Sequence, residues 1–160
     1  YGTKVDAVTV TPDGTRAFIA GNGMVWGVDL LAMRIFTEIK LGDDARNITS
    51  VKASGNALFV AEGDRYGGGR GGYRLWRVDL TAGSSRYAVP VQVQNGDLAA
   101  VPNGFSGMDV NAAGTVLVLA APMATDRFSL RQPGDAAGKV FVIDLQNDLN
   151  LGNGRQTQQQ

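Results

Sequence analysis

Hydrophobic and polar residues alternate along this chain in short runs, and this pattern predicts β-strands. In the first part of the chain such runs cover residues 5–10, 17–20, 24–30 and 34–41. Proline and glycine mark the turn at 11–14 between the first two runs. Apolar residues do not follow a helical period, and the chain contains 22 glycines, which disfavour long helices. We therefore expect four short antiparallel strands here.

The same pattern occurs three times. Residues 8–20, 49–61 and 108–120 align on a turn glycine, and each is followed by a strand that ends in Asp-Leu. Four antiparallel strands in ~40–45 residues are typical of a β-propeller blade. We therefore predict an all-β fold of about three propeller blades, which form an open arc or part of a larger propeller. The predicted blades cover about 5–41, 47–93 and 107–151. A β-sandwich is the alternative fold.

The third unit lacks a clear fourth strand. Only residues 148–151 resemble one, and the polar, glutamine-rich tail at 152–160 is expected to be disordered. Closed propellers have typically four to eight blades. An arc of three blades exposes an apolar face at each end, and such faces are usually covered in soluble proteins. We expect the remaining blades of a longer parent chain, or another subunit, to cover them.

The repeats resemble the YVTN repeat of YncE-like, lactonase-like bacterial propellers. That repeat has the pattern v-x-v-s-P-D-G-x-x-x-y-V-a followed by v-x-V-i-D-l. Residues 11–14, 18–20 and 28–30 fit this pattern well, whereas the later units lack its proline and aspartate. The resemblance implies a binding or scaffold propeller that is secreted, periplasmic or located at the cell surface. Because a minority of the family are enzymes, it does not fix the function.

Composition limits the chemistry that the chain can perform. It has no histidine and no cysteine, and Glu38 and Glu62 are its only glutamates. Histidine-based triads, thiolate nucleophiles and the commonest zinc ligands are therefore excluded. Basic and acidic residues balance at 15 each, which gives no bulk attraction to nucleic acid or anionic lipid. No apolar run approaches the ~20 residues of a membrane helix. These features favour a binding module without a cofactor over an enzyme.

Three long connections are expected to leave the same face of the blades. They cover residues 63–72, 95–105 and 122–138 and join either the second strand to the third or one blade to the next. Loops carry function more often than the scaffold that holds them. We therefore predict that this long-loop face binds a protein or carbohydrate partner. The predicted contacts are Arg65, Tyr66, Arg70, Phe105, Arg127 and Phe128.

Two sets of residues recur in register, and both are predicted to be structural. The first set closes the third strand of each unit and is expected to accept backbone N–H bonds in the next turn. Its members are Asp29, Asp79 and Asp144. The second set is expected to pack between neighbouring blades. Its members are Trp26, Trp76 and Phe141.

Two further features suggest ligands but have simpler interpretations. The glycine-rich stretch at 63–74 contains arginine and tyrosine, as do segments that bind single-stranded nucleic acid. In a neutral chain we interpret it as a flexible hairpin loop. Asp43, Asp44, Glu62 and Asp64 offer oxygen ligands for Ca²⁺, but without D-x-D-x-D-G spacing we expect solvated turn carboxylates and no metal site. The alternative function is a lactonase-like hydrolase that depends on a divalent metal.

Overall fold

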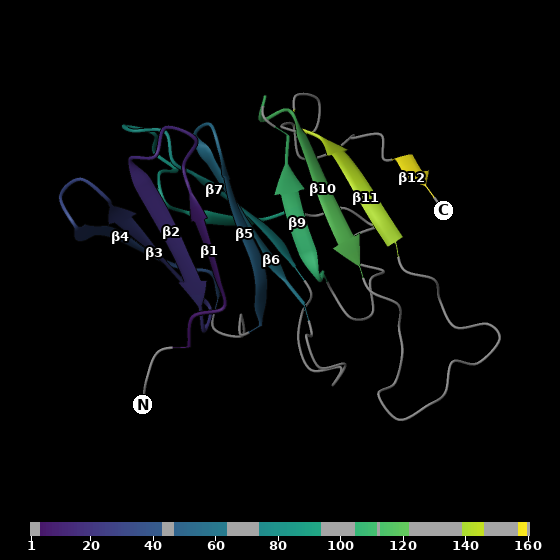
Figure 1. Cartoon of the computed structure of the whole chain (residues 1–160), viewed down its shortest axis with the longest axis horizontal. Coiled ribbons are helices and arrows are strands. Elements are labelled where there is room, and N and C mark those ends of the chain that lie inside the picture. The colour runs from purple at the N-terminus through teal and green to yellow at the C-terminus, as the bar shows by residue number, and fades with distance from the viewer. Residues whose placement is uncertain are drawn as a thin grey trace.

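The fold is built entirely from β-strands, arranged in three four-stranded antiparallel sheets (Figure 1). The computed structural model describes residues 4–42, 47–63, 74–93, 105–111, 113–121, 139–145 and 157–159. Each sheet corresponds to one of the three repeats that the sequence predicted. We refer to the sheets as blades 1, 2 and 3.

Blade 1 has the order β1-β2-β3-β4, as expected for an up-and-down blade. Its strands are β1 (Ala7–Val10), β2 (Arg16–Gly21), β3 (Met24–Asp29) and β4 (Arg34–Lys40). A β-bulge in β4 inserts one extra residue, because Gly27 pairs with Thr37 while Val28 pairs with Ile35. The inserted residue is Phe36.

Blade 2 has the same order, but its fourth strand is shorter than the sequence suggested. Its strands are β5 (Ile48–Ser54), β6 (Ala57–Glu62), β7 (Leu75–Asp79) and β8 (Pro90–Gln92). The sequence pattern alone predicts that residues 86–93 form this fourth strand, but in the structure the turn continues to residue 89. Within it the Ala88 N–H donates to the Asp79 carbonyl at 2.8 Å, and Ala88 has a left-handed φ of 59°. A residue in that conformation interrupts a strand.

Blade 3 obtains its fourth strand from the end of the chain. Its strands are β9 (Gly107–Val110), β10 (Val116–Ala121), β11 (Lys139–Asp144) and β12 (Thr157–Gln159). β12 pairs antiparallel with β11, within the tail that the sequence suggested to be disordered. The strand suggested at 148–151 lies outside the described residues. An edge strand pairs through its backbone N–H and C=O groups, so a polar segment can form one without a hydrophobic pattern.

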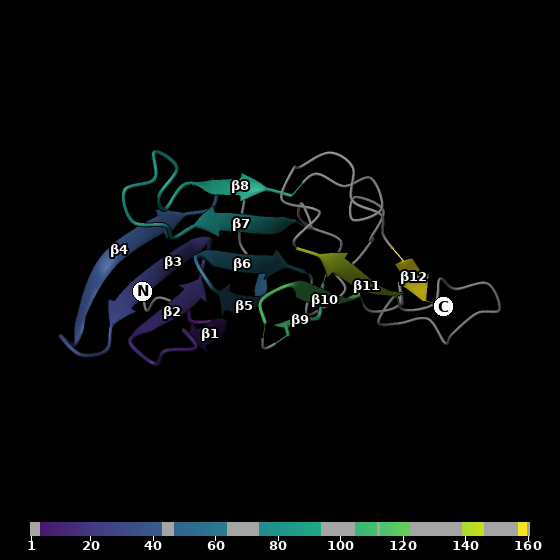
Figure 2. The same ribbon diagram turned by 90° about the horizontal axis from the view of Figure 1, so that it is seen from above.

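The blades are arranged as in a propeller. The first strands β1, β5 and β9 lie next to one another, whereas the fourth strands spread apart, as Figure 2 shows from above. One apolar core lies between blades 1 and 2, and a second lies between blades 2 and 3. β6 contributes to both, since Leu58 and Val60 belong to the first core and Phe59 and Ala61 to the second. Blade 2 is therefore covered on both sheet faces.

Among the described residues, no element packs on the outer sheet face of blade 1. Trp26, Trp76 and Phe141 occupy equivalent positions, and each points toward the side where a preceding blade would lie. Trp76 and Phe141 are buried against blades 1 and 2 respectively, which confirms their predicted packing role. Trp26 is only partly buried, and Val8 and Ile35 beside it are 63% and 56% exposed.

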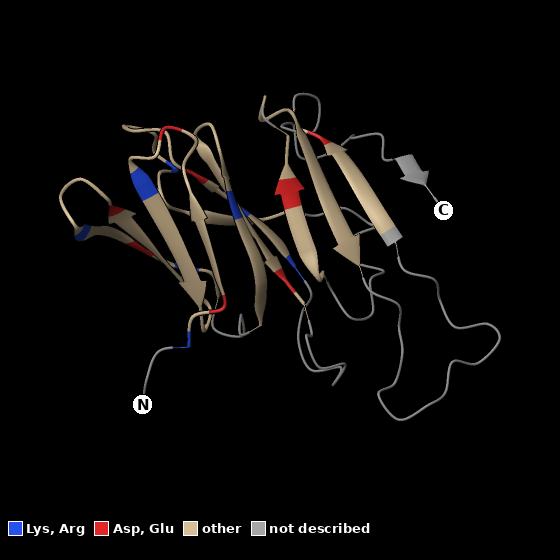
Figure 3. Cartoon of the chain, viewed as in Figure 1, with Lys and Arg blue, Asp and Glu red and all other residues tan. Residues whose placement is uncertain are grey.

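Blade 3 shows the complementary pattern on its own outer sheet face. Phe18, Phe59 and Val118 are equivalent residues that point toward the side of a following blade. Phe18 and Phe59 are buried, but Val118 is 38% exposed. Val140, on the adjacent strand β11, is 45% exposed. In Figure 3 the middle parts of β2 and β10 carry no charged residue. We call these two outer sheet faces the end faces. They are mostly apolar, but Glu38 pairs with Trp26 and Asp109 pairs with Val118.

Candidate functional site

The long connections start and end at the same face of the blades (Figure 1). Connection 63–74 joins β6 to β7, connection 93–106 joins β8 to β9, and connection 122–138 joins β10 to β11. Most residues of these connections lie outside the described ones. Their described ends define the long-loop face. The opposite face, which we call the tight-turn face, holds the turns β1–β2, β3–β4, β5–β6, β7–β8 and β9–β10.

Phe105 connects the ends of the three long connections. Its backbone N–H donates to the Glu62 carbonyl at 3.1 Å, at the end of β6. Its ring packs edge-on against Phe141 of β11, with 6.2 Å between the ring centroids and 82° between the ring planes. Ala121, the last residue of β10, belongs to the same buried cluster. One buried phenylalanine is thus shared by the bases of all three connections.

The glycine-rich connection passes very close to Phe105. The Gly63 N–H donates to the Asn47 carbonyl at 2.9 Å. A Cβ atom on Gly63 would collide with the Phe105 carbonyl oxygen, so only glycine fits at this crossing. At least the first glycine of this stretch therefore has a packing role.

A buried ion pair holds the two ends of the glycine-rich connection together. Glu62 is 2% exposed, and its carboxylate accepts hydrogen bonds from Arg74 Nε at 2.7 Å and Trp76 Nε1 at 2.9 Å. The Arg74 guanidinium also lies over the Trp76 ring, 4.9 Å from its centroid. The sequence interpretation of Glu62 as a solvated carboxylate is therefore wrong, because the side chain is buried and paired.

The other carboxylates considered as calcium ligands, Asp43, Asp44 and Asp64, lie outside the described residues. Within the described ranges, no three acidic side chains come close enough together to hold a metal ion.

Most of the predicted contact residues lie in the long connections. Arg65, Tyr66, Arg70, Arg127 and Phe128 are outside the described residues, so their role stays a prediction. Phe105 is described and is 1% exposed. The structure thus places its ring in the core beneath the long-loop face rather than on the surface. Periodicity could not show this, because Phe105 lies just before β9 in a connection without a hydrophobic pattern.

The aspartates that close the third strands stabilise turns at the tight-turn face. Asp29 Oδ1 accepts the backbone N–H groups of Leu31 and Ala32 at 2.9 and 2.8 Å. Asp79 accepts the Thr81 N–H at 2.8 Å and the Ser84 hydroxyl at 2.6 Å. The predicted structural role is confirmed for both.

Acid should remove the contribution of Asp79 to stability. Hydrogen bonds from the Ser84 hydroxyl and from Thr81 lower the pKa of Asp79 to about 2. A carboxyl with a lowered folded-state pKa stabilises the fold above its unfolded-state value of about 3.9, and this stabilisation is lost as the pH falls toward 2. We expect Asp79→Asn to be less stable than the wild type at pH 6, and the difference to shrink toward pH 2 and to vanish below it. Denaturant unfolding of both proteins across this range measures the difference, and a pH-independent difference would contradict the assignment.

Comparisons with known proteins identify the class of fold. The sequence matches no protein-family model and no curated protein. Hydrazine synthase from Kuenenia stuttgartiensis is similar in structure, with a TM-score of 0.60 and 19% identity over 97% of this chain and 38% of that one. The β-propeller domain of Cps50 (Swd1) from Myceliophteria thermophila has a TM-score of 0.56 and 12% identity over 97% of this chain and 42% of that one. At such identities the likeness concerns the fold alone.

The chain therefore consists of β-propeller blades. It spans less than half of the length of either similar structure. Among the described residues, no helix has the length and apolar character needed to cross a membrane.

Proposed function

We propose that this chain is a non-catalytic binding module that recognises a protein or carbohydrate partner through its long-loop face. It is a segment of a larger bacterial propeller protein of the YVTN/YncE-like kind. That protein is secreted, periplasmic or attached to the cell surface.

The convergence of the long connections on Phe105 is the observation that carries this proposal. The connections differ in length and sequence, but their bases are fixed by one buried ring, by the close crossing at Gly63 and by the Glu62–Arg74 ion pair. A rigid base that presents variable loops is the usual architecture of a recognition surface. Among the described residues, the longest connection at the tight-turn face covers 80–89, between β7 and β8, and is shorter than any of the three long connections.

The residue types in the long connections suit binding. Arg65, Tyr66, Arg70, Arg127 and Phe128 combine arginines with aromatic rings. These side chains provide large contact areas and directed hydrogen bonds, and Arg and Tyr are enriched among the residues that dominate interface energetics. Phe105 supports them from below rather than contacting the partner.

The end faces support the proposal that the chain is part of a larger propeller. Trp26 is partly exposed where Trp76 and Phe141 are covered, and Val118 is exposed where Phe59 is covered. Further blades packed on both sides would bury these positions as blade 2 is buried. The similar propeller structures are more than twice as long as this chain, which leaves room for such blades.

The long-loop face can be tested with two matched sets of variants. The first set replaces Arg65, Tyr66, Arg70, Arg127 and Phe128 with alanine, and the control set replaces the exposed Arg34 and Arg86 at the tight-turn face. Binding of the wild type to a glycan array and to an array of secreted and surface proteins provides the ligands. We expect the first set to weaken binding at least tenfold, and the control set to leave it unchanged. Loss of binding only in the control set would overturn the proposal.

A further inference from the structure

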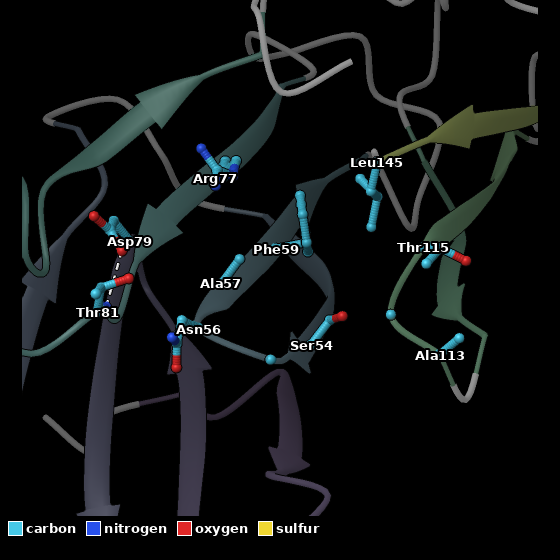
Figure 4. Close-up of a pocket in the computed structure, with 12 residues that line it drawn as sticks. Ser54, Asn56, Ala57, Phe59, Arg77, Asp79, Thr81, Ala113, Thr115 and Leu145 are labelled. Atoms are coloured by element: carbon cyan, nitrogen blue, oxygen red, sulfur yellow. Dashed lines mark hydrogen bonds between the residues drawn. The ribbon is translucent and has the colours of Figure 1, made fainter. Parts of the chain in front are cut away.

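A cavity of about 360 Å³ lies between blades 2 and 3 at the tight-turn face (Figure 4). Blade 2 contributes Ser54 and Asn56 from the β5–β6 hairpin and Arg77 and Asp79 from β7. The β9–β10 turn of blade 3 contributes Thr115 on the opposite side. Phe59, Ala57 and Leu145 make much of the remaining lining apolar. This site is distant in the fold from the long-loop face and does not depend on the function proposed for it.

The equivalent space between blades 1 and 2 is filled by an aromatic ring. There the β4 bulge inserts Phe36, whose ring packs edge-on against Phe18 with 6.1 Å between the centroids. The ring lies over Gly27, where an added Cβ would come within 2.7 Å of the Phe36 ring. Glycine at this position and the bulge beside it together make room for the ring.

Blade 2 lacks both of these features. Arg77 stands at the position equivalent to Gly27 and is paired with Phe59, which corresponds to Phe18. The strand β8 has no bulge here, because Val91 pairs with Arg77 and Pro90 pairs with Val78. No extra side chain is therefore inserted above Phe59. The cavity is present because blade 2 has Arg77 where blade 1 has Gly27, and because blade 2 has no bulged aromatic ring that corresponds to Phe36.

Arg77 has unused hydrogen-bonding capacity. Its Nε atom is buried and has no hydrogen-bond partner among the described residues. The nearby Asp79 makes no hydrogen bond to this atom. Its carboxylate accepts the Thr81 N–H and the Ser84 hydroxyl instead. A buried donor without an acceptor is unfavourable. Because this atom is shielded from solvent, the Arg77 side chain must turn toward the cavity to reach an acceptor on a ligand, and the bond so formed would be stabilising. The guanidinium fork matches a planar carboxylate, to which it can donate two parallel bonds.

We propose that this cavity binds a small organic carboxylate, which pairs with Arg77 and places its apolar body against Phe59 and Leu145. The single arginine and the neighbouring Asp79 carboxylate favour a monoanion over a phosphate dianion, because Arg77 is the only cation among the described residues that line the cavity. The hydroxyl of Thr115 and the amide of Asn56 offer further donors at the rim. The volume is near the lower end of the range for small-molecule sites, which suits a compact acid.

Titration with benzoate, followed by NMR, tests this site directly. Benzamide is the matched neutral probe, since it has the same ring but no charge. We expect benzoate to cause a saturable shift of the Arg77 Nε–H resonance and of the Thr115 amide, and benzamide to cause none. Non-saturable shifts, or equal shifts with both probes, would refute carboxylate binding here. This measurement uses the wild-type protein and so does not depend on a variant that folds.

Two variants extend the test. Arg77→Met keeps an unbranched side chain but removes the charge, and should weaken benzoate binding at least tenfold. Arg34→Met removes one exposed arginine at the far side of blade 1, and should leave benzoate binding unchanged. Unaltered affinity in Arg77→Met would overturn the proposal, whereas loss of partner binding at the long-loop face would leave it standing.

Discussion

Trp76→Ala is expected to lower the free energy of unfolding by about 3–5 kcal/mol, whereas Trp26→Ala should lower it by less than about 1.5 kcal/mol. The two tryptophans occupy equivalent positions in neighbouring blades. Trp76 is buried against blade 1 and its indole N–H donates to Glu62, so its removal leaves a cavity and a buried acceptor with one bond fewer. Trp26 lies on an end face without a neighbouring blade.

Denaturant unfolding of the two variants, measured side by side, checks this contrast. Trp76→Phe is the control that separates packing from hydrogen bonding, because Phe141 already occupies the same position in blade 3. We expect Trp76→Phe to recover most of the stability that Trp76→Ala loses. Equal costs for Trp26→Ala and Trp76→Ala would mean that the outer face of blade 1 is already covered in this chain.

Phe105→Ala should be as destabilising as Trp76→Ala and should in addition loosen the bases of all three long connections. Removal of a fully buried phenylalanine costs about 3–5 kcal/mol. The ring packs against Phe141, and the backbone of Phe105 contacts both Glu62 and Gly63. We expect faster hydrogen exchange at the amides of Glu62, Gly63 and Phe141.

Phe36→Ala provides a matched control for Phe105→Ala. Phe36 is also an aromatic residue in an edge-on pair, but it packs against Phe18 between blades 1 and 2. Its loss should destabilise the chain without changing exchange at Gly63 or Phe141. If both variants accelerated exchange at the long-loop face equally, Phe105 would not be the residue that organises it.

The sequence predicted the blades because the repeat determines both pattern and pairing. An alternating run, a turn glycine and an Asp-Leu strand recur three times, and antiparallel neighbours in sequence pair most simply with each other. The turn role of Asp29 and Asp79 was also predictable, since a carboxylate two residues before a backbone N–H commonly accepts from it. The end faces were predictable as well, because an arc of three blades exposes one sheet face at each end.

The contacts at the long-loop face were not predictable from the sequence. Glu62 and Arg74 meet because the glycine-rich connection returns the chain to the partner strand. The length of this connection does not show which residues of the two strands pair. Phe105 has no periodic neighbours that would mark it as buried. The short strand β8 depends on the left-handed conformation of Ala88, which β-propensity does not reveal.

The cavity at Arg77 depends on a still finer difference between the blades. Gly27 and Arg77 occupy equivalent positions. Their effect on the space beside them can be deduced only when the bulge at Phe36 is known. A bulge changes the register by one residue, and no residue type in β4 marks it uniquely. The sequence pattern therefore predicts a binding surface only at the long-loop face, whereas the structure adds a second candidate site at the tight-turn face.

Sedimentation velocity of the 160-residue chain over a range of concentrations tests the central claim, which is that the end faces are built to pack against further blades. With those blades absent, we expect self-association that increases with concentration, because other copies would cover Val8, Trp26, Val118 and Val140. Trp26→Lys, which places a charge on one end face, should reduce this association. A single monomeric species at the highest concentration, in both the wild type and the variant, would contradict the claim.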